Sequence, residues 1–398
     1  MSIQGVIFDV SGTMLNGTHA VPGIVDAVSR LRALGVQIVA AQNNGPAQTV
    51  ATQLNQAGIL CDHVVTRREV GINKGSPRWI EHICRLTGLA TNQLIYVGDS
   101  ELDMITASHS KVVYIHAAWT GTTSAYGFQA PAPGWVAAVV THIFRKQHSW
   151  GWALSQPASG GRTLRQFALV DVNVVKQAAI QNDLVAMLKD RREPQVGLMP
   201  LREFVILHLT ASIYADGLQD QTDTWGTMPS HDGQRTGRMA HSLDTVAKLF
   251  RDRYERDLLI RHQPAQHSSD ARSQGGLRGA VANQVATLHL NPAALGRITG
   301  RTVLLIDDFL TKGISTGVGR LLLRMGGADD VIVVATGKYG PSTTVFLRPA
   351  AEHLWEPTQP ALDGSAAAVH YREVDGEFHE AAMDEFIASY RAMQREQW

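Results

Sequence analysis

The chain has few cysteines, no excess of charge and no long apolar run, and each shortage argues against a class of protein. Only two of its 398 residues are cysteines, Cys61 and Cys84, and their separation matches no metal-ligand spacing. Basic and acidic side chains number 36 each, so no overall field favours nucleic acid. No apolar run is long enough to span a membrane, and the first residues lead straight into a strand, unlike a signal peptide. We therefore expect a cytoplasmic protein.

Strand and helix signals alternate along the whole chain. A content of 44% hydrophobic and 18% charged residues is that of a globular protein, and the length allows two domains. A polar, glycine-containing stretch at 155–162 indicates a linker. We predict an α/β protein of two domains, each a mostly parallel sheet flanked by helices. The predicted parts are a first domain at 1–150, a linker at 151–165, a second domain at 166–340 and an extension at 341–398 that packs on the second domain.

Two adjacent acids, Asp307 and Asp308, follow an apolar strand pattern and precede a turn and a helix. Backbone N–H groups at such a junction converge on the helix start and suit a phosphate dianion. Carboxylates just upstream can accept hydrogen bonds from a sugar diol, so ribose 5-phosphate meets both demands. The alternative is an ordinary strand–turn–helix in which the acids merely cap the helix. The turn residues are Thr311, Lys312, Gly313, Ile314, Ser315 and Thr316.

This segment resembles the phosphoribosyl-diphosphate signature of type I phosphoribosyltransferases. The resemblance implies that Asp307 and Asp308 bind the ribose and that the turn 311–316 binds the 5′-phosphate. Lys312 departs from the usual second threonine of that turn. The implied partners are phosphoribosyl diphosphate and a nucleobase-like acceptor.

The same resemblance implies two further contacts with the diphosphate. The loop after the first strand of the second domain usually touches it, which makes Pro229 and Ser230 candidates, with an ordinary turn as the alternative. A polar segment from 258 to 278 suits a mobile loop that closes over a polyanion. Its arginines, Arg261, Arg272 and Arg278, could clamp the diphosphate, since guanidinium groups fit that geometry.

A second set of polar residues occurs near the N-terminus. An apolar strand pattern ends in Asp9 and is followed by a glycine turn with Ser11. A second strand ends at Gln42 and Asn43, and Lys74 precedes a helical stretch. A further strand ends in Asp99, with Asp103 four residues later.

This ordered set resembles the haloacid dehalogenase-like superfamily, which consists mostly of Mg²⁺-dependent phosphohydrolases that form an aspartyl phosphate. The resemblance implies that Asp9 is the nucleophile and that Mg²⁺ is held by Asp9, Asp99 and the carbonyl of Ser11. It also implies that Lys74, supported by Asp103, stabilises the transferring phosphoryl charge. Gln42 and Asn43 would contact the substrate.

Three features depart from that family. Ser11 stands where the family has its acid/base carboxyl, so we expect either slow turnover of simple alkyl phosphates or a preference for leaving groups that need little protonation. Gln42 replaces a hydroxyl residue, although its amide can donate the same hydrogen bond. Neither usual insertion site has room for a cap domain, so we expect the second domain or another subunit to cover the site.

We therefore predict a bifunctional enzyme of nucleotide metabolism, forming homo-oligomers. The second domain would transfer a phosphoribosyl group to a nucleobase-like acceptor. The first would remove phosphate from the product or from a related ester. Two alternatives stay open: a phosphoribosyltransferase with a non-catalytic first domain kept for assembly, or a nucleotide-sensing regulatory protein.

Overall fold

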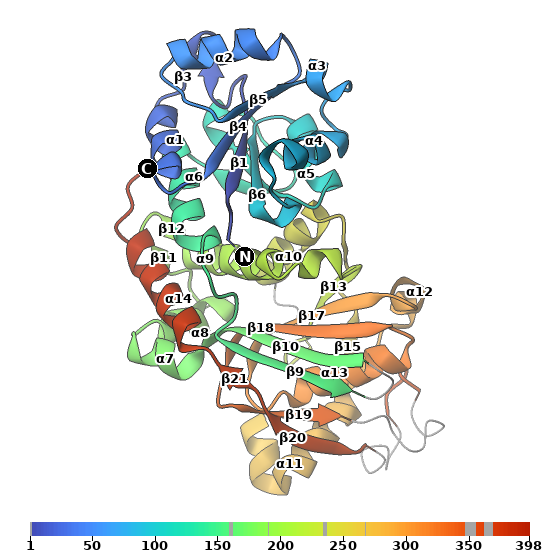
Figure 1. The fold of residues 1–398 in the computed structure, drawn as a ribbon. Helices are drawn as coiled ribbons and strands as arrows, with labels where there is room; N and C mark the ends of the chain where they lie inside the picture. The colour runs from blue at the N-terminus through green and yellow to red at the C-terminus, as the bar shows by residue number, and fades with distance from the viewer. Residues whose placement is uncertain are drawn as a thin grey trace.

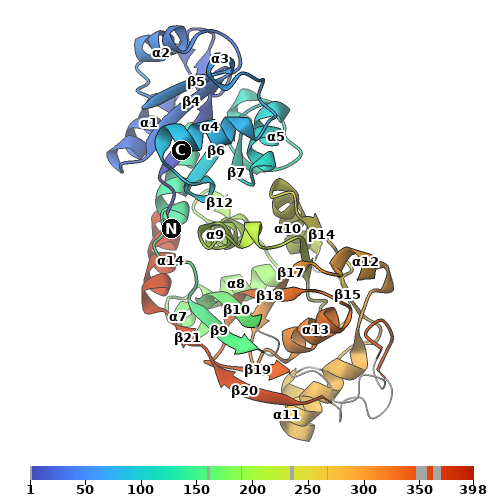
Figure 2. The same ribbon diagram turned by 45° about the vertical axis from the view of Figure 1, so that its right-hand side comes forward.

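The computed structural model describes residues 2–158, 162–189, 191–233, 237–266, 268–346, 356–361 and 369–398. Two α/β units lie one above the other in Figure 1, with the N-terminal unit in blue and teal at the top. The turned view in Figure 2 shows helices on both faces of the lower sheet. The predicted α/β class is thereby confirmed. No helix in the described ranges is both long and apolar enough to cross a membrane.

The first sheet is parallel throughout and has the order β5-β4-β1-β6-β7-β8. Its central strand β1 (Gly5–Asp9) is buried, with Val6 and Phe8 on one face and Ile7 on the other. Continuous apolar strands of this kind are typical of a parallel sheet that is covered on both faces. The other strands are β4 (Gln37–Gln42), β5 (His63–Thr66), β6 (Leu94–Gly98), β7 (Val113–Ala117) and β8 (Phe128–Ala130), with a small hairpin of β2 (Leu15–Asn16) and β3 (His19–Ala20).

Helices cover both faces of this sheet. One face packs against α1 (Ile24–Ala33), α2 (Ala47–Gln56) and α6 (Pro133–Val139) with its π-helical continuation η3 (Val140–Phe144). The other face packs against α4 (Arg78–Thr87) and α5 (Glu101–His109). The short elements are α3 (Arg67–Val70), η1 (Thr91–Gln93) and η2 (Ala118–Thr120).

The second sheet is mixed and has the order β14-β13-β17-β18-β10-β9-β21. Its parallel part comprises β14 (Arg253–Tyr254), β13 (Thr224–Thr227), β17 (Thr302–Leu310), β18 (Asp330–Lys338) and β10 (Arg162–Asp171). The antiparallel edge is formed by β9 (Trp152–Ala158) and β21 (Glu377–Phe378). Two hairpins stand apart, β15 (Leu259–Arg261) with β16 (Leu288–Leu290) and β19 (Ser342–Phe346) with β20 (Tyr371–Asp375).

Helices also flank the second sheet, and Figure 1 places α9 (Leu201–Ala215) and α10 (Gly237–Leu249) between the two sheets. The remaining elements of this unit are α7 (Val172–Gln177), α8 (Gln181–Leu188), β11 (Gln195–Val196), β12 (Met199–Pro200), η4 (Leu218–Asp220), α11 (Ser268–Thr287), η5 (Pro292–Ala294), α12 (Leu295–Ile298), α13 (Ile314–Met325) and α14 (Glu380–Met393).

The predicted linker at 151–165 differs from the structure. Most of that stretch belongs to β9 and β10, which pair in antiparallel register from Ala158↔Arg162 to Trp152↔Ala168. The strands begin there because Trp152, Leu154 and Leu164 are buried in the core of the second sheet, which outweighs the polar residues between them. The C-terminal extension contacts the second sheet through β21 and α14, and α14 also contacts η3 of the first unit.

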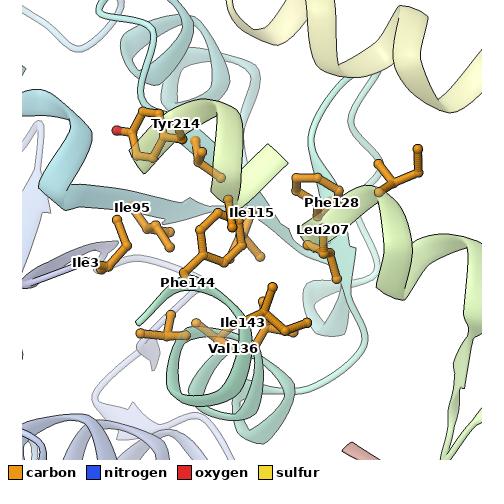
Figure 3. Packing of buried hydrophobic residues seen from close by; sticks show 14 of the residues in the cluster. Ile3, Ile95, Ile115, Phe128, Val136, Ile143, Phe144, Leu207 and Tyr214 are labelled. Carbon is orange, nitrogen blue, oxygen red and sulfur yellow. The ribbon is translucent and has the colours of Figure 1, made fainter. Parts of the chain in front are cut away.

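One hydrophobic cluster runs through both units. It joins Ile95 and Phe144 of the first unit to Leu207 and Tyr214 of α9, as Figure 3 shows. The Tyr214 hydroxyl donates to the carbonyl of Leu94, at the start of β6, over 2.9 Å. Because the strands are parallel, the second unit therefore packs against the amino-terminal edge of the first sheet.

Candidate functional site

The carboxyl edge of the first sheet brings three predicted residues together. Asp9 is the last residue of β1, Gln42 is the last residue of β4, and Asp99 directly follows β6. These strands are neighbours, so their ends meet at one edge. Gly12 completes the turn with φ 85°, and a Cβ at this position would collide with the Asp99 carboxylate. The turn therefore needs glycine for the two loops to approach each other.

Lys74 reaches this edge from the segment between α3 and α4. Its buried ammonium group donates to Asp9 and, over 2.9 Å, to Asp103. The Asn43 side chain accepts the backbone N–H of Lys74 over 2.8 Å and fixes its approach. The rings of Trp79 and Tyr96 lie 6.0 and 5.9 Å from the ammonium nitrogen, within cation–π range.

Asp103 is held by four donors and is only 1% exposed. Its Oδ1 accepts from Lys74 and from the Tyr96 hydroxyl, each over 2.9 Å. Its Oδ2 accepts from the hydroxyl and the backbone N–H of Ser100, over 2.5 and 3.2 Å. Ser100 and Asp103 also form the capping box that starts α5. The helix start thus fixes the carboxylate that orients Lys74.

Burial dominates the electrostatics of this cluster. It raises the pKa of Asp9 to about 7; the Lys74 charge opposes this shift and the Asp103 charge adds to it. Burial alone would lower the pKa of Lys74, but Asp103 and Asp9 outweigh it and raise that pKa. Burial and the Asp103 charge also raise the pKa of Asp99. A bound cation would relieve this crowding of acids.

The acids are arranged as a cation site requires. Carboxylate oxygens of Asp9, Asp99 and Asp103 lie within 4.8 Å of one another. Oxygen ligands suit Mg²⁺, a hard cation. Since the four donors on Asp103 already occupy its oxygens, Asp9 and Asp99 are the better ligands, with the carbonyl of Ser11 as the predicted third.

The structure places Ser11 and Gln42, the two residues that depart from the family pattern, differently with respect to solvent. The Ser11 side chain is exposed in the turn after β1. The side-chain oxygen of Gln42 is buried and has no hydrogen-bond partner among the described residues. A hydrogen bond from the nitrogen of this amide to a substrate phosphate stays a prediction.

The expectation that the second domain covers this site is wrong. The second unit packs at the start of β6, whereas Asp9 and Asp99 lie at the opposite ends of their strands. Figure 1 shows this edge pointing away from the second unit. The second unit does not reach the site because α9 buries its apolar surface against the amino-terminal edge of the first sheet. Cover by another subunit stays a prediction.

The second predicted site lies at the carboxyl edge of the second sheet. Strand β17 extends beyond the predicted strand end, so Asp307 and Asp308 lie inside it. The strand continues to Leu310 because it pairs with β18 as far as Leu310↔Lys338. Burial, followed by the charge of Asp308, raises the pKa of Asp307 well above its usual range.

The turn after β17 leads into α13 through a glycine in the left-handed conformation. Gly313 precedes α13 with φ 63°, and a Cβ there would collide with Thr343 of β19. No side chain of the described residues caps α13, and Asp307 and Asp308 accept from the backbone N–H groups of Asp308 and Phe309 instead, so the alternative in which the acids cap this helix is wrong. The Thr316 hydroxyl donates to the Gly313 carbonyl over 3.2 Å, and Ile314 and Ser315 form the first turn of the helix.

A pocket of about 430 Å³ adjoins this turn. It is lined by Thr311, Lys312, Tyr339, Gly340, Pro341 and Ser342. Beneath it the buried Lys338 donates to the carbonyls of Thr311, Tyr339 and Ser342 over 2.6, 3.0 and 2.8 Å. Burial, with the nearby charge of Lys312, lowers the pKa of Lys338 to about 8. Lys312 itself pairs with Glu373 of β20 over 2.9 Å.

Arg261 is not arranged as a diphosphate clamp. Its guanidinium donates to the Ser230 carbonyl over 2.9 Å, to Thr287 over 2.5 Å and to Gln284 over 2.9 Å. It therefore holds the loop after β13 against α11. Pro229, in that loop, lines a second pocket of about 240 Å³ together with Arg261.

The expected mobile loop differs as well. Its second half belongs to α11, which has a kink at Gly276. Arg278 is exposed on that helix. The side chain of Arg272 lies outside the described residues. Of the two arginines whose side chains are described, Arg261 is used in internal hydrogen bonds and Arg278 is exposed on a helix.

The sequence analysis missed Tyr96, Trp79 and Ser100, the residues that surround Lys74 and Asp103. One signal could have found Tyr96. A tyrosine inside a fully buried strand needs a partner for its hydroxyl, and the predicted acids Asp99 and Asp103 follow it closely in sequence.

Comparisons with known proteins agree with this geometry. Residues 9–117 match the family of haloacid dehalogenase-like hydrolases. These residues thus form a haloacid dehalogenase-like hydrolase domain, a class that depends on Mg²⁺. No curated protein matches the chain.

Several solved structures are similar to a part of the chain. A haloacid dehalogenase-like hydrolase from Bacteroides fragilis is 12% identical, with a TM-score of 0.30, over 32% of this chain and 95% of its own. A subfamily IA hydrolase from Geobacter sulfurreducens is 15% identical, with a TM-score of 0.27, over 29% and 89%. A 4-nitrophenylphosphatase from Thermotoga maritima is 14% identical, with a TM-score of 0.29, over 31% and 88%.

Proposed function

We propose that the first domain is a Mg²⁺-dependent phosphohydrolase that acts on small phosphorylated molecules. The observation that carries this proposal is the Lys74 ammonium group, which bridges Asp9 and Asp103 beside Asp99. Asp9 would attack phosphorus, and Lys74 would stabilise the charge on the phosphoryl oxygens. A bound Mg²⁺ would neutralise the remaining charge. Asp99 and the Ser11 carbonyl would hold this ion together with Asp9.

The test is phosphate release by the purified full chain with a panel of phosphate compounds and Mg²⁺. We expect Asp9→Asn to abolish turnover, because an amide is not a nucleophile for phosphorus. Removal of the metal by EDTA should do the same, and added Mg²⁺ should restore activity. If Asp9→Asn keeps the wild-type rate, the proposed role of Asp9 is wrong.

We further propose that the second domain binds phosphoribosyl diphosphate and transfers its ribosyl phosphate to a nucleobase-like acceptor. Support comes from the order of features at one sheet edge: the acids Asp307 and Asp308, the left-handed Gly313 and the uncapped start of α13. Asp307 and Asp308 would hold the ribose hydroxyls. The turn 311–316 would hold the 5′-phosphate.

The substitution Gly313→Ala tests this binding site. A side chain at φ 63° is strained, and its Cβ would push Thr343 away, so we expect binding of phosphoribosyl diphosphate to fall at least tenfold. Isothermal titration with Mg²⁺ present measures the change. Gly296→Ala in α12 is the matched control, since no atom lies within 4 Å of the place its Cβ would take, and it should bind like the wild type. Equal binding by all three proteins contradicts the assignment.

Turnover separates the alternatives for the whole chain. A bifunctional enzyme that is given phosphoribosyl diphosphate and a nucleobase releases diphosphate. It also releases phosphate in a reaction that depends on Asp9. A transferase with a scaffold domain releases only diphosphate. A nucleotide sensor binds phosphoribosyl diphosphate but releases neither product.

A further inference from the structure

Among the described residues, the charged groups beside Asp9 can stabilise phosphoryl charge, but none of them is free to donate a proton to a leaving group. Three charged groups shift the pKa of Asp9, namely Lys74, Asp103 and Asp99, and each already has another task. Lys74 is bound between two carboxylates, and Asp103 accepts four hydrogen bonds. Asp99 is a predicted metal ligand.

Both ring nitrogens of the neighbouring histidine, His116, also have hydrogen-bond partners. His116, at the end of β7, is buried and is turned toward the Thr122 carbonyl over 3.0 Å and the Tyr114 hydroxyl over 3.3 Å. The Thr122 hydroxyl in turn donates to the Asp99 carbonyl over 2.9 Å. His116 therefore supports the loop that carries Asp99 and does not face the substrate. Ser11 offers only a hydroxyl.

The missing acid discriminates between substrates by their leaving groups. A sugar or nucleotide 5′-phosphate must release an alkoxide, which is nearly as strong a base as hydroxide. A phosphate group is a far weaker base, with a second pKa of about 6. General acid catalysis accelerates a reaction by roughly 10²- to 10⁴-fold. Its loss therefore slows hydrolysis of the ester but has little effect on hydrolysis of the anhydride.

We infer that the first domain prefers a phosphoanhydride, and inorganic diphosphate in particular, over alkyl phosphate esters. This inference rests on the proposed phosphohydrolase activity. Diphosphate is also what the proposed transfer in the second domain releases. The first domain would then remove that product and draw the reversible transfer forward, without dephosphorylating the nucleotide.

The reaction balances without a protein acid. A carboxylate oxygen of Asp9 forms a bond to one phosphorus of singly protonated diphosphate, and the bond from that phosphorus to the bridging oxygen breaks. The bridging oxygen keeps the electron pair and leaves as hydrogen phosphate, which already carries the proton. Water then attacks the phosphorus of the aspartyl phosphate, Asp9 leaves as a carboxylate, and one proton passes to the solvent.

The experiment compares kcat/KM of the full chain with Mg²⁺ for diphosphate, glycerol phosphate, a nucleoside 5′-monophosphate and a series of aryl phosphates. We expect diphosphate to exceed the two alkyl esters by about 100-fold or more. Rates along the aryl series should rise steeply as the phenol becomes more acidic. Ser11→Asp should raise hydrolysis of the alkyl esters at least about tenfold relative to diphosphate.

Asp9→Asn is the control that excludes a contaminating enzyme. If alkyl esters react within about threefold of diphosphate and depend on Asp9, the preference is overturned while the phosphohydrolase stands. If no substrate gives phosphate that depends on Asp9, the proposed function fails and this inference fails with it. The substrate comparison and the aryl series use only the wild-type chain, so they decide the question even if Ser11→Asp does not fold.

Discussion

At the scale of single residues, Asp103 shows how this chain positions the ammonium group of Lys74. A carboxylate buried at 1% exposure keeps its charge only if donors satisfy its oxygens, and four donors do so here. Two of them, from Ser100, also start α5. The geometry of Lys74 is therefore built into a helix terminus and does not depend on a flexible loop alone.

The hydroxyl of Tyr96 should matter for turnover. In Tyr96→Phe the Oδ1 atom of Asp103 loses one of its two donors, and a hydrogen bond to a charged group contributes about 1.5–3 kcal/mol. We expect kcat to fall by roughly tenfold or more with a smaller change in KM, because the proposed role of Lys74 is to stabilise charge in the transition state. Steady-state kinetics on the best substrate measures both constants. Tyr126→Phe, in the same domain, is the control, and an unchanged kcat in Tyr96→Phe contradicts the role.

At the scale of elements, the segment between η3 and β9 carries a half-buried lysine. Lys146 donates to the carbonyls of Ser149 and His208, each over 3.3 Å, and to the Ser212 hydroxyl. Burial lowers its pKa from 10.5 to about 7, although Asp216 and Glu385 oppose this shift. This short segment thus connects the end of the first unit to α9 through the side chain of one lysine.

This lysine predicts a pH dependence of stability. Between pH 7 and 10.5 the unfolded chain binds more protons at Lys146 than the folded chain does, so stability rises with pH over that window. The free energy of unfolding increases by at most about 3 kcal/mol between pH 7 and 9.5. In Lys146→Met it should disappear. Thermal denaturation at several pH values measures the difference in Tm between wild type and variant, and parallel curves for the two proteins would refute the prediction.

At the scale of the whole molecule, the two units are not independent. The cluster in Figure 3 combines strands and helices of the first unit with α9 of the second. Because apolar surface at the amino-terminal edge of the first sheet is buried by α9, neither unit keeps its full core without the other. The predicted domain boundary near residue 150 therefore separates two sheets but not two cores.

Leu207→Ala tests this coupling. Leu207 is fully buried in the shared cluster, and such a truncation costs about 2–5 kcal/mol. We expect the phosphohydrolase activity and the global fold to be lost together, at a Tm several degrees lower, even though α9 contains no proposed catalytic residue. Thermal inactivation and circular dichroism measure the two transitions. Leu198→Ala, at a position that is 63% exposed, should change neither. If activity survives to the wild-type temperature while the second unit melts early, the cores are separate.

The sequence alone was enough to predict the α/β class and the gathering of Asp9, Lys74 and Asp99. Apolar strands that end in polar residues imply parallel neighbours, and the carboxyl ends of parallel strands meet at one edge. Periodicity and local turn chemistry are short-range properties, so they can be recognised along the chain.

Only the tertiary structure decided which edge of the first sheet the second unit covers, that Arg261 is used inside the protein, and that Tyr96 bonds to Asp103. These outcomes depend on contacts between side chains that are far apart in sequence or that lie on different elements. Packing selects among many such pairings by the shape and apolar area of whole surfaces, and no local pattern records that choice.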